Sequence, residues 1–274
     1  MVIKMKKSIL SFAIIITAFA ITACNVKVND PYNYDITAPS PPSGIYALNG
    51  DQRVDLSWYE NRENDVAGYN VYYSYSYNGK YTLIGSTETN YFIDDGAVNG
   101  DTYYYAVTAY DYNGNESDLS YDVVYTTPRP EGYNQSVLDY RSFPNHGGYS
   151  FTTYSTVPYD DNSSDFFFEN YNGDFYLDVW NDSEIQDMGV TQDIYDIAYA
   201  PTIGWSSTKD EFAVVGHTYV IWTWDNHYAK IRINSITNSK ISFDWAFQLV
   251  EGNRTLKQAP EKKERSKLVK SQKR

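Results

Sequence analysis

The sequence has few of the residues that carry chemistry in most enzymes and metal proteins. Its 274 residues include 1 Cys and 3 His. An intramolecular disulfide is therefore excluded, and a metal site built from Cys and His has few ligands to draw on. The motifs Gly-x-Ser-x-Gly and His-Glu-x-x-His and the phosphate-binding loop are all absent. We therefore expect no catalytic site, no metal site and no cofactor.

Basic residues are also scarce, with 22 Lys and Arg against 35 Asp and Glu and a net charge of −13. A protein that binds nucleic acid needs a basic face, so nucleic acid is excluded as a partner. No amphipathic helix of useful length is found, whereas aromatic residues reach 17 % and include 29 Tyr. This composition favours strands. The length suits about two domains, and we predict an all-β fold.

The chain begins with the layout of a secretory signal peptide. Lys4, Lys6 and Lys7 precede an apolar run over residues 9–21, which is shorter than the roughly 20 residues of a transmembrane helix. The run ends in Ile21-Thr22-Ala23-Cys24, and small residues before a cysteine resemble the lipobox of bacterial lipoproteins. The resemblance implies that residues 1–23 are a cleaved signal peptide. It also implies that Cys24 is lipidated and anchors the protein to a membrane.

The segment after the cysteine predicts a tether and a location. Residue 25 is Asn rather than Asp, which by resemblance to lipoprotein sorting in Gram-negative bacteria favours the outer membrane. The expected location is thus the cell envelope, lipid-anchored at the outer membrane. Residues 24–39 include Pro31 and Pro39 and show no sustained apolar period. That composition predicts a semi-extended tether.

Residues 40–128 consist of short alternating segments separated by glycine-containing turns, the pattern of a β-sandwich. Several of these segments resemble a fibronectin type III domain, in which Trp58 and Tyr103 are signature residues and Tyr103 occupies the tyrosine-corner position. The matching segments, in chain order, are Pro41-Pro42-Ser43, Val54–Trp58, Gly68–Tyr72, Gly100–Ala109 and Gly114–Ser117. The resemblance implies a spacer or a protein-contact module, because such a fold does not by itself define a function.

Residues 133–256 predict a second antiparallel β-domain, either a sandwich or a barrel-like meander. Side chains follow a period of two over 219–224, where Tyr219, Ile221 and Thr223 alternate with Val220, Trp222 and Trp224, and over 228–233 and 241–248. This period predicts the half-buried strands of an antiparallel meander. Asp225-Asn226 and Thr237-Asn238-Ser239 supply the turns between these strands. The stretch 186–205 is expected to be mostly loop.

Parts of this meander resemble HmuY-like bacterial haem-binding lipoproteins. The resemblance covers 219–230 and 241–248 and implies haem binding through histidines. None of the three histidines, His146, His217 and His227, matches a ligand position of that family. His217 and His227 bracket one strand, so their backbones are expected to lie about 25 Å apart and they cannot share one small ion.

Aromatic residues at one end of the meander give the best ligand hypothesis. Flat aromatic faces can stack on sugar rings, and nearby carboxylates and amides can bond to the sugar hydroxyls. The candidate ligand-binding residues are Trp205, Trp222, Trp224, Asp225, Asn226 and Tyr228. The alternative interpretation is that these aromatic residues pack against the sheet, since large aromatics are mostly buried.

Acidic and basic segments complete the sequence. Asp160, Asp161, Asn162 and Asp165 lack the full calcium-loop signature and its distal Glu, so a solvated acidic loop is expected.

Residues 257–274 hold eight Lys or Arg against two Glu, and this composition predicts a basic disordered tail. The tail is expected to be solvated.

We expect a non-catalytic envelope protein that binds a glycan or an envelope protein, or serves a structural role. Two alternatives remain. The first is haem or metal capture by a converging histidine. The second is a glycan-acting enzyme with two carboxylates at catalytic separation.

Overall fold

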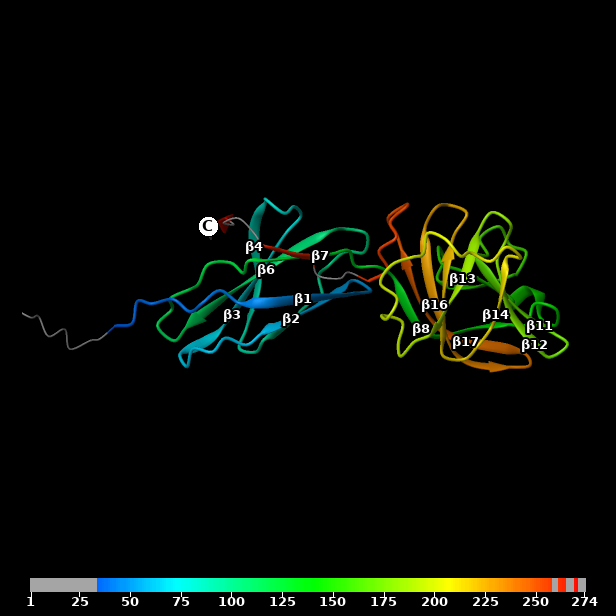
Figure 1. Ribbon diagram of the computed structural model, residues 1–274, viewed down its shortest axis with the longest axis horizontal. Coiled ribbons are helices and arrows are strands. Elements are labelled where there is room, and N and C mark those ends of the chain that lie inside the picture. Colours follow the sequence, from blue (N-terminus) through cyan, green and yellow to red (C-terminus); the bar gives the residue numbers. More distant parts are fainter. Residues whose placement is uncertain (1–33, 258–260, 265–268, 271–274) are drawn as a thin grey trace, which may run out of the picture. The chain divides into compact units, whose positions relative to one another are not determined.

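The computed structural model describes residues 34–257, 261–264 and 269–270 (Figure 1). The chain divides into two compact units, Met1–Asp35 and Ile36–Arg274. The predicted signal peptide, most of the predicted tether and Cys24 lie outside the described residues. Among those that are described, the only helix is the 3-10 turn Pro144–His146 (η1), and none is long and apolar enough to cross a membrane. The second unit is built from β-strands that are antiparallel except at one edge, so the prediction of an all-β fold is confirmed.

The first sandwich pairs a three-stranded sheet, in the order β1-β2-β5, with the sheet β4-β3-β6-β7. Each strand in these two sheets is antiparallel to its neighbours. The strands are β1 (Ser43–Gly50), β2 (Arg53–Tyr59), β3 (Val66–Ser74), β4 (Lys80–Thr87), β5 (Tyr91–Asp94), β6 (Tyr103–Asp111) and β7 (Asp122–Thr126). This arrangement of three strands on four agrees with a fibronectin type III-like sandwich.

Both signature residues of this sandwich lie in its core. Trp58 is 3 % exposed and packs edge-on against Tyr69, with ring centroids 5.3 Å apart. The backbone N–H of Val98 donates a 2.8 Å hydrogen bond to the hydroxyl of Tyr103. A tyrosine that bonds back to the backbone a few residues upstream is the contact that defines a tyrosine corner.

Two pieces of the basic tail extend the larger sheet of this sandwich. β18 (Glu261–Glu264) runs antiparallel to β7, and β19 (Val269–Lys270) runs parallel to β4. The structure thus differs from the expectation of a wholly disordered tail. An edge strand presents unpaired backbone groups, and an extended segment can pair with them whatever its side chains are.

The second sandwich consists of two five-stranded sheets, with orders β10-β9-β11-β12-β14 and β13-β15-β16-β17-β8 (Figure 1). The strands of the first sheet are β9 (Gly148–Ser150), β10 (Ser155–Val157), β11 (Phe166–Tyr171), β12 (Asp174–Asp178) and β14 (Asp210–Phe212). Those of the second sheet are β8 (Glu131–Leu138), β13 (Glu184–Val190), β15 (His217–Trp222), β16 (Tyr228–Thr237) and β17 (Lys240–Gln248). Of the two architectures predicted for this domain, the structure adopts the sandwich.

The predicted meander forms the centre of the second sheet. β15, β16 and β17 pair in sequence, and their inward residues, such as Ile221, Ile231 and Phe243, are fully buried. They pack against aromatic residues of the other sheet, including Phe166 and Tyr149. The alternation of apolar and polar residues therefore identified the buried face correctly.

Two strands of this sheet differ from the sequence-based expectation. β8 begins at Glu131, before the predicted start of the domain at residue 133, and pairs with β17. β13 occupies 184–190, where loop was expected, and it pairs with β15. Only Ile185 of β13 is fully buried, and a bulge at Gly189 interrupts the pairing. An edge strand of this kind lacks the apolar alternation by which a strand is predicted.

The second sandwich repeats the tyrosine corner of the first. The pattern Ala-Val-x-Gly-x-Thr-Tyr occurs at 97–103 and again at 213–219. In the second copy the N–H of Val214 donates a 2.9 Å bond to the hydroxyl of Tyr219, which in turn donates to the carbonyl of Phe212. Gly100 and Gly216 both have positive φ, at 90° and 84°, a conformation that glycine adopts without strain. The same local sequence thus builds the same corner twice.

Candidate ligand-binding pocket

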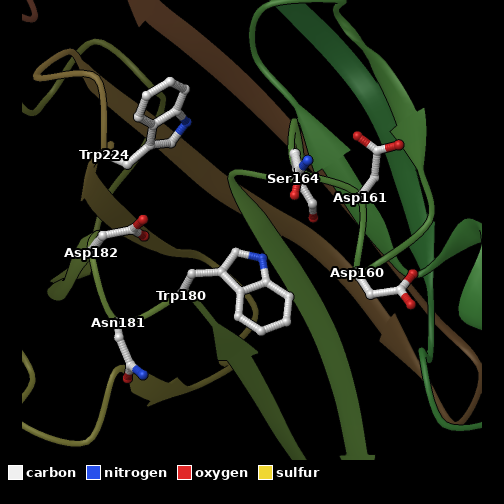
Figure 2. A pocket seen from close by; sticks show the side chains of 8 residues that line it. Asp160, Asp161, Ser164, Trp180, Asn181, Asp182 and Trp224 are labelled. Atoms are coloured by element: carbon white, nitrogen blue, oxygen red, sulfur yellow. The ribbon is translucent and has the colours of Figure 1, made fainter.

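A pocket of about 530 Å³ opens at one end of the second sandwich, within the usual size range of small-molecule sites. Three loops supply its walls: 158–165 before β11, 179–183 between β12 and β13, and the turn 223–227 between β15 and β16. The residues that line it are Asp160, Asp161, Asn162, Ser164, Trp180, Asn181, Asp182 and Trp224 (Figure 2). We call it the tryptophan pocket.

The first loop is held by hydrogen bonds around Asp161. Its carboxylate accepts bonds from the N–H and the hydroxyl of Ser163, at 2.8 and 2.7 Å, and its carbonyl accepts the N–H of Ser164. The bonds from Ser163 lower the pKa of Asp161 below its ordinary value. Asp161 is therefore both a turn-forming residue and an ionised group at the pocket surface.

Trp180 forms a fixed aromatic wall. It is 39 % exposed, and the protein side of its ring packs against Phe167 and Tyr159, with centroids at 5.2 and 6.3 Å. The carbonyl of Trp180 also accepts the N–H of Ser183. These contacts limit its rotamers, so little conformational entropy is lost when a ligand packs on the free part of the ring.

Trp224 is the more exposed of the two tryptophans that line the pocket, with 60 % of its surface accessible. It lies in a turn in which the hydroxyl of Thr223 donates to Asp225, and the N–H of His227 donates back to that hydroxyl. Asn226 has a positive φ of 65°, a conformation that Asn tolerates better than most residues. The turn is thereby rigid, and it directs the Trp224 ring outward.

A buried carboxyl group lies directly behind the pocket. Asp165 is 5 % exposed, and one of its oxygens accepts the N–H of Phe151 at 2.7 Å. The pKa of Asp165 is raised to about 7, mainly by burial; the Phe151 bond opposes this rise and the negative charge of Asp225 adds to it. The expectation of a fully solvated acidic loop therefore holds for Asp160, Asp161 and Asn162, which are exposed, and is wrong for Asp165.

The other predicted aromatic residues lie together, but on a different surface. Trp222 stacks on Tyr228 with centroids 5.6 Å apart, and Trp205 packs on Trp222 at 6.1 Å. All three join a cluster that includes Val220 and Leu256 on the outer face of the second sheet. They are buried or half-buried, so Trp224 is the one predicted aromatic residue that lines the pocket.

The two predicted polar residues belong mainly to the turn. Asp225 accepts the hydroxyl of Thr223 at 2.5 Å. The side chain of Asn226 accepts the indole N–H of Trp222 at 3.0 Å and donates to Glu251. Neither lines the pocket, and both position Trp224. Trp180 was not among the predicted residues; it follows β12 at the start of a loop, and no sequence pattern marks it as a ligand-binding residue.

The outer face of the second sheet is covered, and this explains why the predicted patch is not exposed. The segment 194–205 runs over this face together with 254–257, joined by hydrogen bonds such as that from the Leu256 N–H to the Ala198 carbonyl, 2.7 Å. Lys230, which the alternation placed on a solvated face, is fully buried there, and its ammonium donates to the Ile197 carbonyl. Burial lowers its pKa well below the ordinary value.

The three histidines are on separate elements and do not converge. Nδ1 of His217 donates to Asp187 at 2.8 Å, and Nδ1 of His227 donates to the carbonyl of Gln248 at 3.0 Å. His146 lies in η1 and is exposed. In the described part of the chain, no group of three potential metal ligands includes a histidine.

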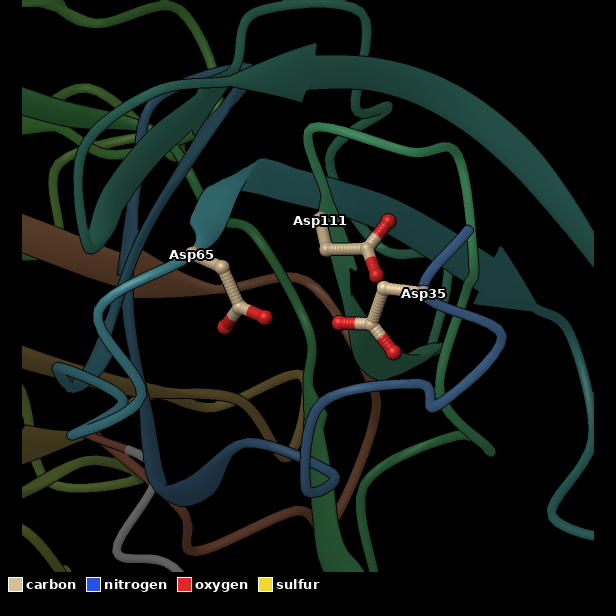
Figure 3. Close-up of side chains that lie close together, drawn as sticks. All are labelled: Asp35, Asp65 and Asp111. Atoms are coloured by element: carbon tan, nitrogen blue, oxygen red, sulfur yellow. The ribbon is translucent and has the colours of Figure 1, made fainter. Parts of the chain in front are cut away.

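Acidic side chains also gather in the first sandwich, where β6 ends (Figure 3). Asp111 accepts the backbone N–H groups of Asn113 and Asn115, at 2.9 and 2.8 Å, and the amide of Asn115. Burial alone would raise the pKa of Asp111, but these bonds outweigh it and lower the pKa. The carbonyl of the nearby Asp65 accepts the N–H of Tyr112. We assign Asp111 a structural role in closing this turn.

Comparison with known proteins gives local matches. No family model matches the chain. An amylopullulanase of Thermoanaerobacterium saccharolyticum is 41 % identical over 100 residues, which cover 36 % of this chain and 8 % of that protein. Exoglucanase B of Cellulomonas fimi is 31 % identical over 130 residues, covering 47 % of this chain and 12 % of that protein. The chain thus spans only a small part of the length of these relatives.

Similar solved structures cover about a third of the chain. A fibronectin type III-like protein from Clostridium thermocellum is 26 % identical, covers 34 % of this chain and 95 % of its own, and has a TM-score of 0.28. A β-1,2-glucanase from Parabacteroides distasonis is 28 % identical and covers 34 % of this chain and 13 % of its own, with a TM-score of 0.30. Our description of the first sandwich rests on its own strand order and the Tyr103 contact.

Proposed function

We propose that this chain is a non-catalytic glycan-binding protein of the cell envelope, and that the tryptophan pocket is its binding site. The observation that carries the proposal is the pair of tryptophans, Trp180 and Trp224, which project from two separate rigid loops into one pocket. Carboxylates and amides surround them and can accept and donate hydrogen bonds to sugar hydroxyls. Exposed, immobilised aromatic rings are typical anchors of binding sites.

The comparisons with known proteins also support a role in glycan binding. The relatives are named as an amylopullulanase and an exoglucanase, and one similar structure is a β-1,2-glucanase. These names connect the matching segment with proteins that act on glucans. Because the chain covers so little of each relative, we propose that it shares an accessory module with them rather than an activity.

The anchoring of the protein is a second part of the proposal. In this account Cys24 is lipidated after cleavage of residues 1–23, residues 24–39 act as the tether, and the first sandwich is a spacer. Labelling of the expressing cells with a palmitate analogue tests this. The wild-type chain should be labelled and fractionate with the outer membrane, whereas Cys24→Ser should be neither labelled nor retained there.

Haem or metal capture is the second candidate function, from the HmuY-like pattern of the meander. It needs a histidine that faces a ligand, and both His217 and His227 already use Nδ1 for internal bonds. His217 begins β15, whereas His227 lies beyond the other end of that strand, in the turn before β16. The glycan proposal therefore has the stronger geometric support.

Thermal unfolding of the full chain in a detergent without sugar groups separates these functions. A ligand that binds only the folded state stabilises it by about 2.7 kcal/mol at a hundredfold excess over Kd. We expect an upward shift of Tm with one class of glycan and none with haemin or calcium. A shift with haemin alone would replace the glycan proposal by haem capture. Release of reducing sugar from a bound glycan would show an enzyme instead.

A further inference from the structure

The tryptophan pocket carries negative charge that no basic residue of its lining offsets. Asp160, Asp161 and Asp182 are all exposed at its rim, and no Lys or Arg is among the lining residues. In Figure 2 these carboxylates lie around the ring of Trp180. Charges of one sign within one concave site raise the local concentration of the opposite charge.

Among the residues that the structure describes, no basic side chain neutralises these carboxylates. Within the described residues, the ion pairs nearest in the chain are Arg141 with Glu169 and Lys209 with Glu184, and no ion pair includes a pocket carboxylate. Asp161 is held ionised by Ser163. The charge is therefore available to a ligand.

An aromatic face beside carboxylates is complementary to a cation. An ammonium group above a tryptophan ring is attracted by the electrons of the ring, and it donates charge-assisted hydrogen bonds to carboxylates. An acidic sugar would instead meet like charges, which disfavours its binding. A neutral sugar gains the stacking without the charged bonds.

We propose that the tryptophan pocket selects amino sugars with free amines, in glycans built from 2-amino-2-deoxyhexose units, over neutral and acidic glycans. The inference deepens the proposed function and rests on it. Trp180 and Trp224 supply the stacking faces, and Asp161 and Asp182 bind the ammonium groups. N-acetylation of the same glycan removes the positive charge and should remove the preference.

Calorimetric titration of the full chain tests this with four tetrasaccharides: a glucosamine tetramer, its N-acetylated form, a neutral glucan tetramer and a galacturonate tetramer. The titrations are run at pH about 6, where Asp161 is ionised because its bonds from Ser163 lower its pKa. We expect the glucosamine tetramer to bind at least about tenfold more tightly than its acetylated form at low salt, and the galacturonate not to bind. The difference should shrink at about 0.3 M salt, where charges are screened within several ångströms.

Matched variants separate site binding from general attraction to an acidic protein. Asp161→Asn/Asp182→Asn keeps the hydrogen-bond acceptors of the turn and removes two charges, and should reduce glucosamine binding to the level of the acetylated form. The control Asp101→Asn/Asp174→Asn removes two exposed charges outside the pocket and should leave binding unchanged.

Each outcome bears on the proposal. Equal affinity for the free and acetylated tetramers would overturn the selectivity for amines but leave glycan binding intact. An equal loss in both double variants would show general charge attraction and would also overturn it. If none of the four glycans binds, the proposed function itself fails.

Discussion

Asp165 combines a buried position with a titratable carboxyl group, and its replacement by Asn should stabilise the protein at alkaline pH. Burial raises its pKa from an ordinary value near 3.8 to about 7, with Asp225 contributing. The folded state therefore binds a proton that the unfolded state has already released between these two pH values. Stability from this group is full below about pH 4 and is lost as pH rises through about 7.

The size of the effect follows from the two pKa values. At 1.36 kcal/mol for each pH unit, the difference corresponds to about 4 kcal/mol as an upper limit. Asn removes the ionisation, and its side-chain oxygen still accepts the N–H of Phe151. We therefore expect Asp165→Asn to raise the free energy of unfolding by up to about 4 kcal/mol at pH 8. At pH 4 the two proteins should be nearly equal.

Urea unfolding of the full chain, followed by tryptophan fluorescence between pH 4 and 8, measures this. Five of the six tryptophans lie in the second sandwich, since Trp58 alone precedes it. Burial also raises the pKa of Asp178 to about 7, so the variant should keep part of the pH dependence. Asp174→Asn, at an exposed site, is the control. The reasoning is refuted if Asp165→Asn unfolds at lower urea than the wild type at pH 8.

Two further substitutions test the packing of the sandwiches. Tyr103→Phe removes the acceptor of the Val98 N–H, and we expect a loss of about 0.5–1.5 kcal/mol in urea unfolding, the net contribution of a typical hydrogen bond; an unchanged midpoint would deny the corner a stabilising role. Gly132→Ala places a Cβ 2.4 Å from the indole nitrogen of Trp245, and we expect a loss of about 1–3 kcal/mol. Wild-type stability would mean that Trp245 moves freely.

The alternation of side chains along the sequence predicted those strands in which every second side chain is buried. Ile221, Ile231 and Phe243 lie on one face of β15, β16 and β17 as expected, because a strand turns successive side chains to opposite faces. The edge strand β13 has no such alternation. Its place in the sheet depends on pairing with β15, which is information from a distant part of the chain.

Local alternation also fails to predict where single residues of the candidate site lie. Trp222 and Trp224 are two apart and on one strand would share a face. β15 ends at Trp222, and the turn at Thr223 directs Trp224 into the pocket while Trp222 stacks on Tyr228. The covering of the outer face by 194–205 has no local signal, so the sequence left open whether Trp222 is exposed or packs against the sheet, and the structure agrees with the second interpretation.

The second tyrosine corner could have been predicted from a repeated sequence pattern that the prediction did not use. The repeated pattern Ala-Val-x-Gly-x-Thr-Tyr at 97–103 and 213–219 would have placed a second tyrosine corner at Tyr219. Trp180 has no comparable pattern. It joins Trp224 only because loops from both sheets of the second sandwich meet at one end.

The most direct test of the account is the affinity of Trp180→Ala and Trp224→Ala for the glycan that the wild type binds best, measured by calorimetry on the full chain. Both rings are placed in the pocket, so each variant should lose at least about tenfold in affinity, equal to 1.4 kcal/mol. Trp224→Ala should keep the wild-type Tm, whereas Trp180→Ala should lower it because the ring packs on Phe167 and Tyr159, so both affinities are measured well below the Tm. Tyr199→Ala, an exposed aromatic residue outside the pocket, should bind as the wild type does. Wild-type affinity in both tryptophan variants would contradict the central claim that this pocket is the binding site.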